Sequence, residues 1–188
     1  LFYIAGTGIN KYGDEFFSKY KCEDATFSTY APLSDEKLAE LEKQGKLKAV
    51  ITQNIDGLHY AAGSKEVLEL HGSVHRNYCT KCGRSYPVEY IAEASGVPTC
   101  ECGGIIKPDV VLYEEGLDSM TMQKTVQYIS KADVLIIGGT SLAVYPAAGF
   151  IDYFRGSHLV VINMDKTQRD VNADLLINER IGEVFQQL

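Results

Sequence analysis

Four of the five cysteines lie in two close pairs, a spacing that is typical of a metal site. Two residues separate Cys79 from Cys82, and one residue separates Cys100 from Cys102. Four thiolates complete the tetrahedral coordination of Zn²⁺ and leave no open position for water, so the pattern predicts a structural Zn²⁺ and not a catalytic one. The alternative is four free thiols. The fifth cysteine, Cys22, stands alone, and we interpret it as a partly buried free thiol.

Two histidines precede the first cysteine pair in the stretch HGSVHRNYCTKC, residues 71–82. His71 is followed by Gly72 at the end of a predicted strand, which favours an exposed position in a loop. Because the four cysteines need no histidine to complete their site, His71 is available for acid–base chemistry near neutral pH. The other histidines have no neighbours that indicate catalysis, and we interpret them as bystanders: His59, His75 and His158.

Small and polar residues follow four of the predicted strands. They are residues 6–8 (GTG), 52–59 (TQNIDGLH), 138–142 (GGTSL) and Asn163. Glycines at a strand end let a phosphate approach backbone amides, and the amide and carboxylate side chains in the second stretch could hold ribose hydroxyls and a carboxamide. The first two stretches could instead be turns without a ligand. If they converge on one edge of a sheet, they favour a dinucleotide over a mononucleotide.

The elements that must position these residues alternate between short apolar strands and helical segments. Continuous apolar runs, without alternating polar residues, are typical of a parallel sheet that is covered on both faces. The sequence therefore predicts an α/β fold, a doubly wound Rossmann-like sheet whose ligands bind beyond the carboxyl ends of the strands. Strand signals fade between about residues 76 and 107, as expected of a small zinc-binding insertion. The predicted strands are 1–5, 49–52, 67–70, 110–113, 133–137, 159–162 and 174–177, and the predicted helices are 34–44, 120–131, 147–154 and 181–188.

Composition and charge disfavour several classes of protein. The 188 residues are 45% apolar and 23% charged, which is ordinary for one globular domain with or without a small insertion. The formal net charge is −7 and the lysines and arginines are scattered, so we expect no direct nucleic-acid binding, and a cationic peptide is the better partner. No apolar run reaches membrane-spanning length, we expect no signal peptide, and paired cysteines suit a reducing compartment, so we expect a cytoplasmic protein without membrane contact.

In their order and spacing, these motifs resemble the sirtuins, the NAD-dependent protein lysine deacylases, in their short bacterial form. The matching stretches are 6–9, 52–59, 70–72, 107–111, 138–142 and 162–163, together with the four cysteines. The most specific part is TQNIDGLH followed by His71-Gly72 and the cysteine pairs. The resemblance implies a Rossmann-like NAD-binding domain at residues 1–75 and 107–188, with residues 11–32 as a helical part of the small domain, and a zinc-binding module at residues 76–106.

The resemblance also implies a reaction. The carbonyl oxygen of an acyl-lysine protein or peptide would attack C1′ of the nicotinamide ribose, and nicotinamide would leave. His71 would then act as the general base through the ribose hydroxyls, with Asn54 as the second catalytic residue. The products would be free lysine and O-acyl-ADP-ribose. Val111 and Tyr113 would line the tunnel for the acyl-lysine, and the substrate would add as a strand beside residues 110–113.

By the same resemblance, NAD would contact residues from each polar strand end. The implied phosphate contacts are Gly6, Thr7 and Gly8; the nicotinamide ribose and carboxamide contacts are Gln53, Asn54 and Asp56; and the remaining phosphate and ribose contacts are Gly139, Thr140, Ser141, Leu142 and Asn163.

The chain departs from the sirtuin pattern in two places. The family usually follows its first glycine motif with a cofactor loop that contains GIPDFR, whereas here residues 6–10 run directly into Lys11. Loss of that loop would weaken NAD binding. The family also usually has glycine after the aromatic residue of the tunnel, where this chain has Glu114, and this change would alter how the substrate backbone lies.

Two other functions remain open on the sequence. An NAD-dependent protein ADP-ribosyltransferase would use the same fold and differ in the nucleophile that takes the ribosyl group. A non-catalytic NAD- or ADP-ribose-binding module would keep the cleft for its partner surface. His71, Asn54 and Asp56 favour catalysis, since a pure binding module has no use for a base beside the ribose.

Overall fold

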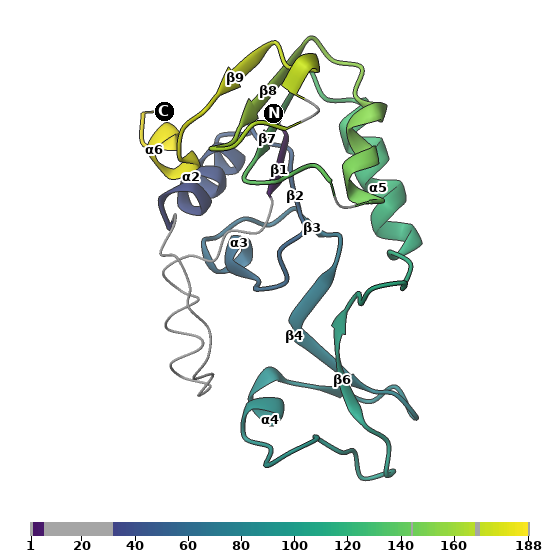
Figure 1. Ribbon diagram of the computed structural model, residues 1–188. Coiled ribbons are helices and arrows are strands. Elements are labelled where there is room, and N and C mark those ends of the chain that lie inside the picture. Colours follow the sequence, from purple (N-terminus) through teal and green to yellow (C-terminus); the bar gives the residue numbers. More distant parts are fainter. Residues whose placement is uncertain (1, 6–31, 144, 168–169, 188) are drawn as a thin grey trace.

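The larger part of the chain is a six-stranded parallel sheet, shown in the upper half of Figure 1. The computed structural model describes residues 2–5, 32–143, 145–167 and 170–187. The strand order is β3-β2-β1-β7-β8-β9, and it reverses between β1 and β7 as in a doubly wound Rossmann-like sheet, so the predicted fold class is confirmed. The strands are β1 (Phe2–Ala5), β2 (Ala49–Thr52), β3 (Val67–Glu69), β7 (Val134–Gly138), β8 (His158–Ile162) and β9 (Leu175–Ile177).

Alternate residues of β2 and β7 pack into cores on opposite faces of this sheet. Ile51 and Ile137 are buried on one face against helix α5 and the 3₁₀ helix η1. Val50 and Ile136 are buried on the other face against α2 and α6, on the left of Figure 1. Because both faces are covered, the strands are apolar throughout. The helix bounds are α2 (Pro32–Lys43), α5 (Ser119–Ser130), η1 (Ala147–Tyr153) and α6 (Ile181–Phe185).

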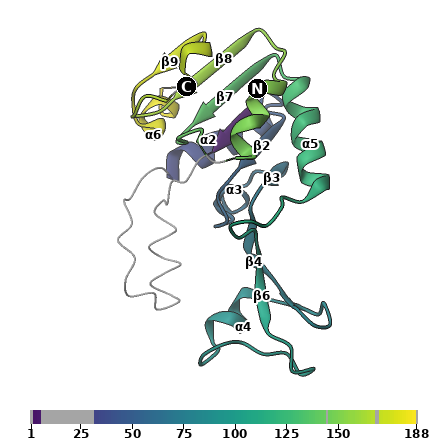
Figure 2. The same cartoon turned by 45° about the vertical axis from the view of Figure 1, so that its right-hand side comes forward.

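A second, antiparallel sheet extends away from the first and carries the cysteines. Its strand order is β5-β4-β6, with β4 at Gly72–Cys79, β5 at Ser85–Tyr86 and β6 at Ile106–Val110. Figures 1 and 2 both show β4 and β6 running side by side from the larger sheet to the insertion, with α4 (Val88–Ala92) at its far end. Two further short elements are α3 (Leu58–Ala61) and the 3₁₀ helix η2 (Asp170–Asn172).

The structure corrects two expectations about local structure. The strand predicted at residues 110–113 is wrong, because β6 ends at Val110 and belongs to the second sheet. The region in which strand signals fade contains the second half of β4, with β5 and the start of β6. The burial along β4 does not alternate, since Arg76 and the residue before it are exposed while Asn77 is buried, so this two-stranded connection gives no periodic signal in the sequence.

Some expectations concern residues outside the described ranges: Gly6, Thr7, Gly8, the lone Cys22 and residues 11–31 of the helical segment expected at 11–32. Within the described ranges, none of the helices combines the length and the apolar character needed to cross a membrane.

Candidate active site

The polar strand ends lie together because the strands of the large sheet end in register. Thr52 of β2 and Gly138 of β7 both pair with Ala5, the last residue of β1. Ile162 of β8 pairs with Gly138, and Glu69 of β3 pairs with Thr52. The residues that follow these strands therefore leave the sheet at the same edge, across the point where the strand order reverses. This is the edge at which doubly wound sheets bind their ligands.

His71 lies at this edge with a defined orientation. Its Nδ1 is 3.0 Å from the backbone oxygen of Gln53, and its own backbone oxygen accepts a hydrogen bond of 3.0 Å from the amide of Val111. A carbonyl oxygen can only accept, so Nδ1 carries the proton of the neutral ring, and Nε2 keeps its lone pair. The imidazole is therefore held in the tautomer that a base acting through Nε2 requires.

Asn54 and Asp56 lie in the loop that follows β2. The Asn54 side-chain oxygen Oδ1 is buried and has no hydrogen-bond partner among the described residues, while the backbone N–H of Asn54 donates to Thr52 Oγ1 at 3.0 Å. A buried oxygen without a partner costs free energy, and a ligand that donates a hydrogen bond would recover it. The carboxylate of Asp56 accepts a hydrogen bond of 3.1 Å from the Leu58 amide, and burial raises the pKa of this carboxyl above its ordinary value of 3.8.

The loop after β7 is attached to the loop after β8 by a reciprocal pair of hydrogen bonds. The backbone N–H of Thr140 donates to Asn163 Oδ1 at 3.0 Å, and Asn163 Nδ2 donates to the backbone oxygen of Thr140 at 2.9 Å. Thr140 Oγ1 also lies 3.4 Å from Gln53 Oε1, which brings the loops after β2, β7 and β8 together. Of the neighbouring residues, Gly139 and Ser141 are exposed, whereas Leu142 is buried in the core.

The structure separates the two residues expected in the acyl-lysine tunnel. Val111 is partly buried and packs against the core of the large sheet, whereas Tyr113 is fully exposed. Glu114, which stands where the family usually has glycine, adopts a left-handed backbone with φ 70°. That conformation is uncommon for residues other than glycine, asparagine and aspartate, so the glutamate occupies a position whose backbone suits glycine.

His75, which we interpreted as a bystander, contacts the same loop as the predicted site residues. Its Nε2 lies 2.8 Å from the backbone oxygen of Asp56. The other bystander in this region, His59, is buried and lies 3.0 Å from the carboxylate of Asp35. No sequence pattern marks the contact of His75, because it joins residues 19 positions apart through a backbone atom.

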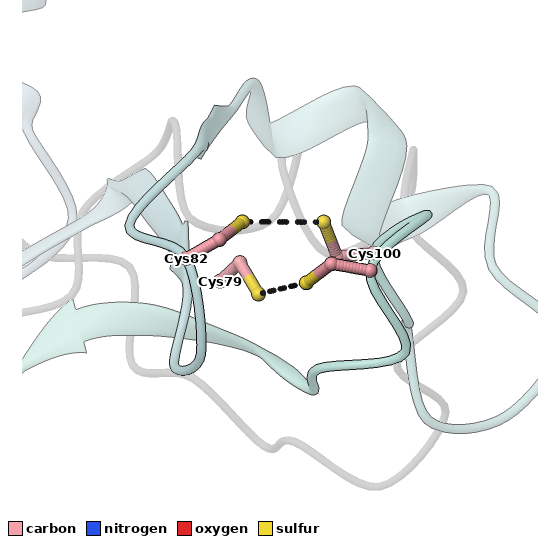
Figure 3. Close-up of side chains that lie close together, drawn as sticks. Cys79, Cys82 and Cys100 are labelled. Atoms are coloured by element: carbon pink, nitrogen blue, oxygen red, sulfur yellow. Dashed lines mark hydrogen bonds between the residues drawn. The ribbon is translucent and has the colours of Figure 1, made fainter.

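The four cysteines of the insertion come together at one point (Figure 3). Their four Sγ atoms lie within 4.8 Å of one another, with Cys79 and Cys102 3.4 Å apart and Cys82 and Cys100 3.6 Å apart. Tetrahedral Zn–S bonds of about 2.3 Å place sulfurs about 3.8 Å apart, so the donor set fits Zn²⁺. The amide of Lys81 points at Cys79 Sγ at 3.4 Å, a contact that stabilises a thiolate ligand.

Comparison with known proteins places this geometry in a family. Residues 9–146 match the model of the Sir2 family. Over 186 residues the chain is 52% identical to an NAD-dependent protein deacetylase of Clostridium acetobutylicum, which covers 97% of this chain and 76% of that protein. Over 184 residues it is 57% identical to an NAD-dependent protein deacetylase of Clostridium perfringens, which covers 97% of this chain and 75% of that protein.

Solved structures give the same result. The chain is similar to a crystal structure of Sir2 in complex with the inhibitor EX-527, 2′-O-acetyl-ADP-ribose and a deacetylated p53 peptide, with a TM-score of 0.85 and 33% identity over 99% of this chain and 90% of that one. It is equally similar to Sir2 bound to an acetylated peptide, with a TM-score of 0.84, 33% identity and the same coverage.

Proposed function

This chain belongs to the Sir2 family, and we infer from that membership that it is an NAD-dependent protein lysine deacylase. The relatives that it matches are named NAD-dependent protein deacetylases, and the similar solved structures contain NAD, acetylated peptide or propionylated peptide. The observation that carries the proposal is the contact of His71 with Gln53, in the same loop as Asn54 and Asp56, at the carboxyl edge of the sheet. These residues have the acid–base and hydrogen-bonding groups that the reaction needs.

The candidate site fits NAD on two grounds besides the family. The site lies at the crossover of a doubly wound sheet, where a dinucleotide can extend from the loop after β2 to the loops after β7 and β8. Asn54 Oδ1 is a buried acceptor that a ribose hydroxyl can satisfy. We propose that Gln53, Asn54 and Asp56 hold the nicotinamide end, and that Gly6–Gly8, Gly139–Leu142 and Asn163 form the rest of the NAD site.

When bound, NAD supplies nicotinamide as a leaving group and a ribosyl carbon that accepts the acyl oxygen. Within this chain, His71 Nε2 would take up a proton from a ribose hydroxyl, while Nδ1 stays bonded to the Gln53 oxygen. The positive charge that forms on the ring would be stabilised by that carbonyl, and the carboxylate of Asp56 would accept hydrogen bonds from the carboxamide. Asn54 would orient the ribose through its buried side-chain oxygen.

The substrate would be an acyl-lysine in a protein or peptide. We propose that Val111 lines the path of the lysine stem and that the exposed ring of Tyr113 covers the bound substrate from outside. The chain would act in the cytoplasm without contact to nucleic acid or membrane. For domain organisation, we propose a Rossmann-like part at residues 1–75 and 107–188 and a zinc module at residues 76–106.

Zn²⁺ at Cys79, Cys82, Cys100 and Cys102 would be structural. The insertion has a small core of its own, made of Cys79, Cys100 and Ile106 with partly buried Tyr86 and Ile91. A segment with so few buried residues needs an additional constraint, which four metal–thiolate bonds supply. With all four positions taken by sulfur, the metal has no place for a reacting water.

One incubation tests the proposed function against its alternatives. The full-length protein is mixed with NAD and an acetyl-lysine peptide, and nicotinamide and the peptide mass are followed. Deacylation requires nicotinamide release that depends on the peptide, together with loss of the acetyl mass. A gain of the ADP-ribosyl mass on protein would instead identify a transferase, and NAD binding without turnover would identify a binding module.

A further inference from the structure

The first half of β4 (Gly72–Cys79) lies against the loop that follows β2. Its Val74 amide donates a hydrogen bond of 3.0 Å to the Ile55 oxygen, and the ring of His75 contacts the Asp56 oxygen through Nε2 at 2.8 Å. Since a carbonyl oxygen only accepts, Nε2 carries the proton. Two consecutive residues of β4 therefore hold two consecutive residues of the loop.

The ring of His75 also packs directly on Gly57, the residue after Asp56. Gly57 has φ 72°, and a Cβ added to it would lie 2.7 Å from His75 Cδ2 and 3.0 Å from Nε2. Only glycine combines this backbone conformation with so close an approach of the ring. The turn at Asp56 and Gly57 is therefore shaped to receive the imidazole.

We propose that His75 is a positioning residue for the deacylation reaction, which fixes the Asp56–Gly57 turn so that the Asp56 carboxylate faces the cofactor. This inference rests on the proposed function, because it gives that carboxylate a ligand. The Asp56 side chain is already held from one side by the Leu58 amide, and His75 holds its backbone from the other. Without His75 the peptide between Asp56 and Gly57 can rotate, and the carboxylate moves with it.

The effect is expected to be moderate, because His75 is exposed and the contact is a single hydrogen bond. Loss of one such bond corresponds to about a 3- to 10-fold change in an equilibrium constant. We expect the KM for NAD to change and the KM for the peptide to stay the same, since the turn that His75 holds carries Asp56 and none of the proposed substrate contacts.

Three substitutions separate positioning from general support of the fold. The side-chain amide of glutamine reaches about as far as Nε2, whereas the amide of asparagine reaches only as far as Nδ1. His75→Gln should therefore retain the hydrogen bond, and His75→Asn and His75→Ala should lose it. Arg76→Ala is the matched control on the same strand, because Arg76 pairs with Glu69 at 2.6 Å and Asp109 at 2.9 Å and not with the loop.

The experiment measures the KM for NAD at saturating acetyl-lysine peptide, the KM for the peptide, the zinc content and the melting temperature. We expect the KM for NAD to rise about 3- to 10-fold in His75→Ala and His75→Asn and to stay within about twofold in His75→Gln, with the peptide KM and zinc unchanged. Arg76→Ala should lower the melting temperature and leave the KM for NAD unchanged. Because Asp56→Asn is expected to lose turnover, the double variant is compared with it by the Kd for NAD, and adding His75→Ala should not raise that Kd further.

The proposal is overturned if His75→Gln behaves like His75→Ala, or if the variants lose only kcat in parallel with their melting temperature. A wild-type chain that binds NAD without turnover defeats the proposed function alone, and the same comparison is then made with the Kd for NAD. Unequal Kd values for His75→Ala and His75→Gln would still support positioning, and equal values would refute it.

Discussion

Replacement of Gly72 by alanine tests how tightly the backbone beside His71 is constrained. Gly72 has φ 76° and pairs with Val110 across β4 and β6. An added Cβ would overlap the Asp109 carbonyl oxygen and lie 2.9 Å from its carbon. The neighbour is backbone within a paired strand, so it cannot move aside as the end of a flexible side chain could.

The expected cost has two parts. A left-handed backbone costs a residue with a Cβ about 1 kcal/mol, and overpacking against a fixed neighbour adds about 1–3 kcal/mol. Gly45 provides a control for the first part alone, because it has φ 71° and an added Cβ would meet nothing within 4 Å. At about 2–4 °C per kcal/mol for a chain of this size, Gly45→Ala should lower the melting temperature by about 2–4 °C and Gly72→Ala by about 4–16 °C.

The assay pairs thermal unfolding with deacylation at a temperature where both variants are folded. Relief of the overlap must move β6 away from β4, and the hydrogen bond from Val111 to the His71 oxygen moves with it. We therefore expect Gly72→Ala to lose at least about tenfold in kcat/KM through misplacement of His71, while Gly45→Ala retains it. Equal stability and equal activity of the two variants would show that the approach of Asp109 to Gly72 does not constrain the site.

Three further changes probe other parts of the account. Burial raises the pKa of Asp56, so the folded chain holds this proton more tightly than the unfolded chain, and ionisation of Asp56 lowers stability as the pH rises above 3.8. Asp56→Asn should therefore flatten the fall in unfolding free energy between pH 4 and 7, raise stability at pH 7 and lose NAD turnover. If urea unfolding gives the variant the same pH dependence of unfolding free energy as wild type, this reasoning is wrong. Removal of Zn²⁺ by a chelator should expose amides of residues 72–110 to hydrogen exchange while β7 and β8 stay protected, and unchanged exchange in the insertion would argue against a structural metal. Asn163→Ala removes both hydrogen bonds to the Thr140 backbone and should cost about 1–3 kcal/mol of stability. If Asn163 acts by positioning the Thr140 loop, the variant should bind NAD and its 2′-deoxyadenosine analogue more weakly than wild type by the same factor. If only the binding of NAD is weakened, Asn163 contacts the ribose directly.

The large sheet was predictable because strands such as β2 and β7 are buried on both faces. Ile136 and Ile137, for example, face different cores, so the strand that contains them has no polar residue to mark one face. This all-apolar pattern distinguishes a covered parallel sheet from a half-exposed one. Once the sheet was predicted, the polar residues after its strands were expected to meet at one edge, because parallel strands present their carboxyl ends on the same side.

The connection between the two sheets could not be predicted in the same way. β4 and β6 gain their stability from pairing with each other, and their mixed burial carries no period. The contact of His75 with Asp56 and the bonds of Asn163 to Thr140 end on backbone atoms, so the sequence carries no residue type on the partner side that would indicate them. The zinc ligands could be predicted without knowledge of backbone contacts, because all four are cysteines whose spacing in the sequence is typical of a zinc site.

The most direct test of the central claim compares wild type with His71→Ala in peptide-dependent deacylation at saturating NAD, with zinc content and melting temperature measured on the same samples. The account predicts that kcat falls by a factor of about 10²–10⁴, the usual contribution of a general base, while zinc content is unchanged. A variant that keeps kcat within about tenfold of wild type, or that loses its zinc, would contradict the role given to His71.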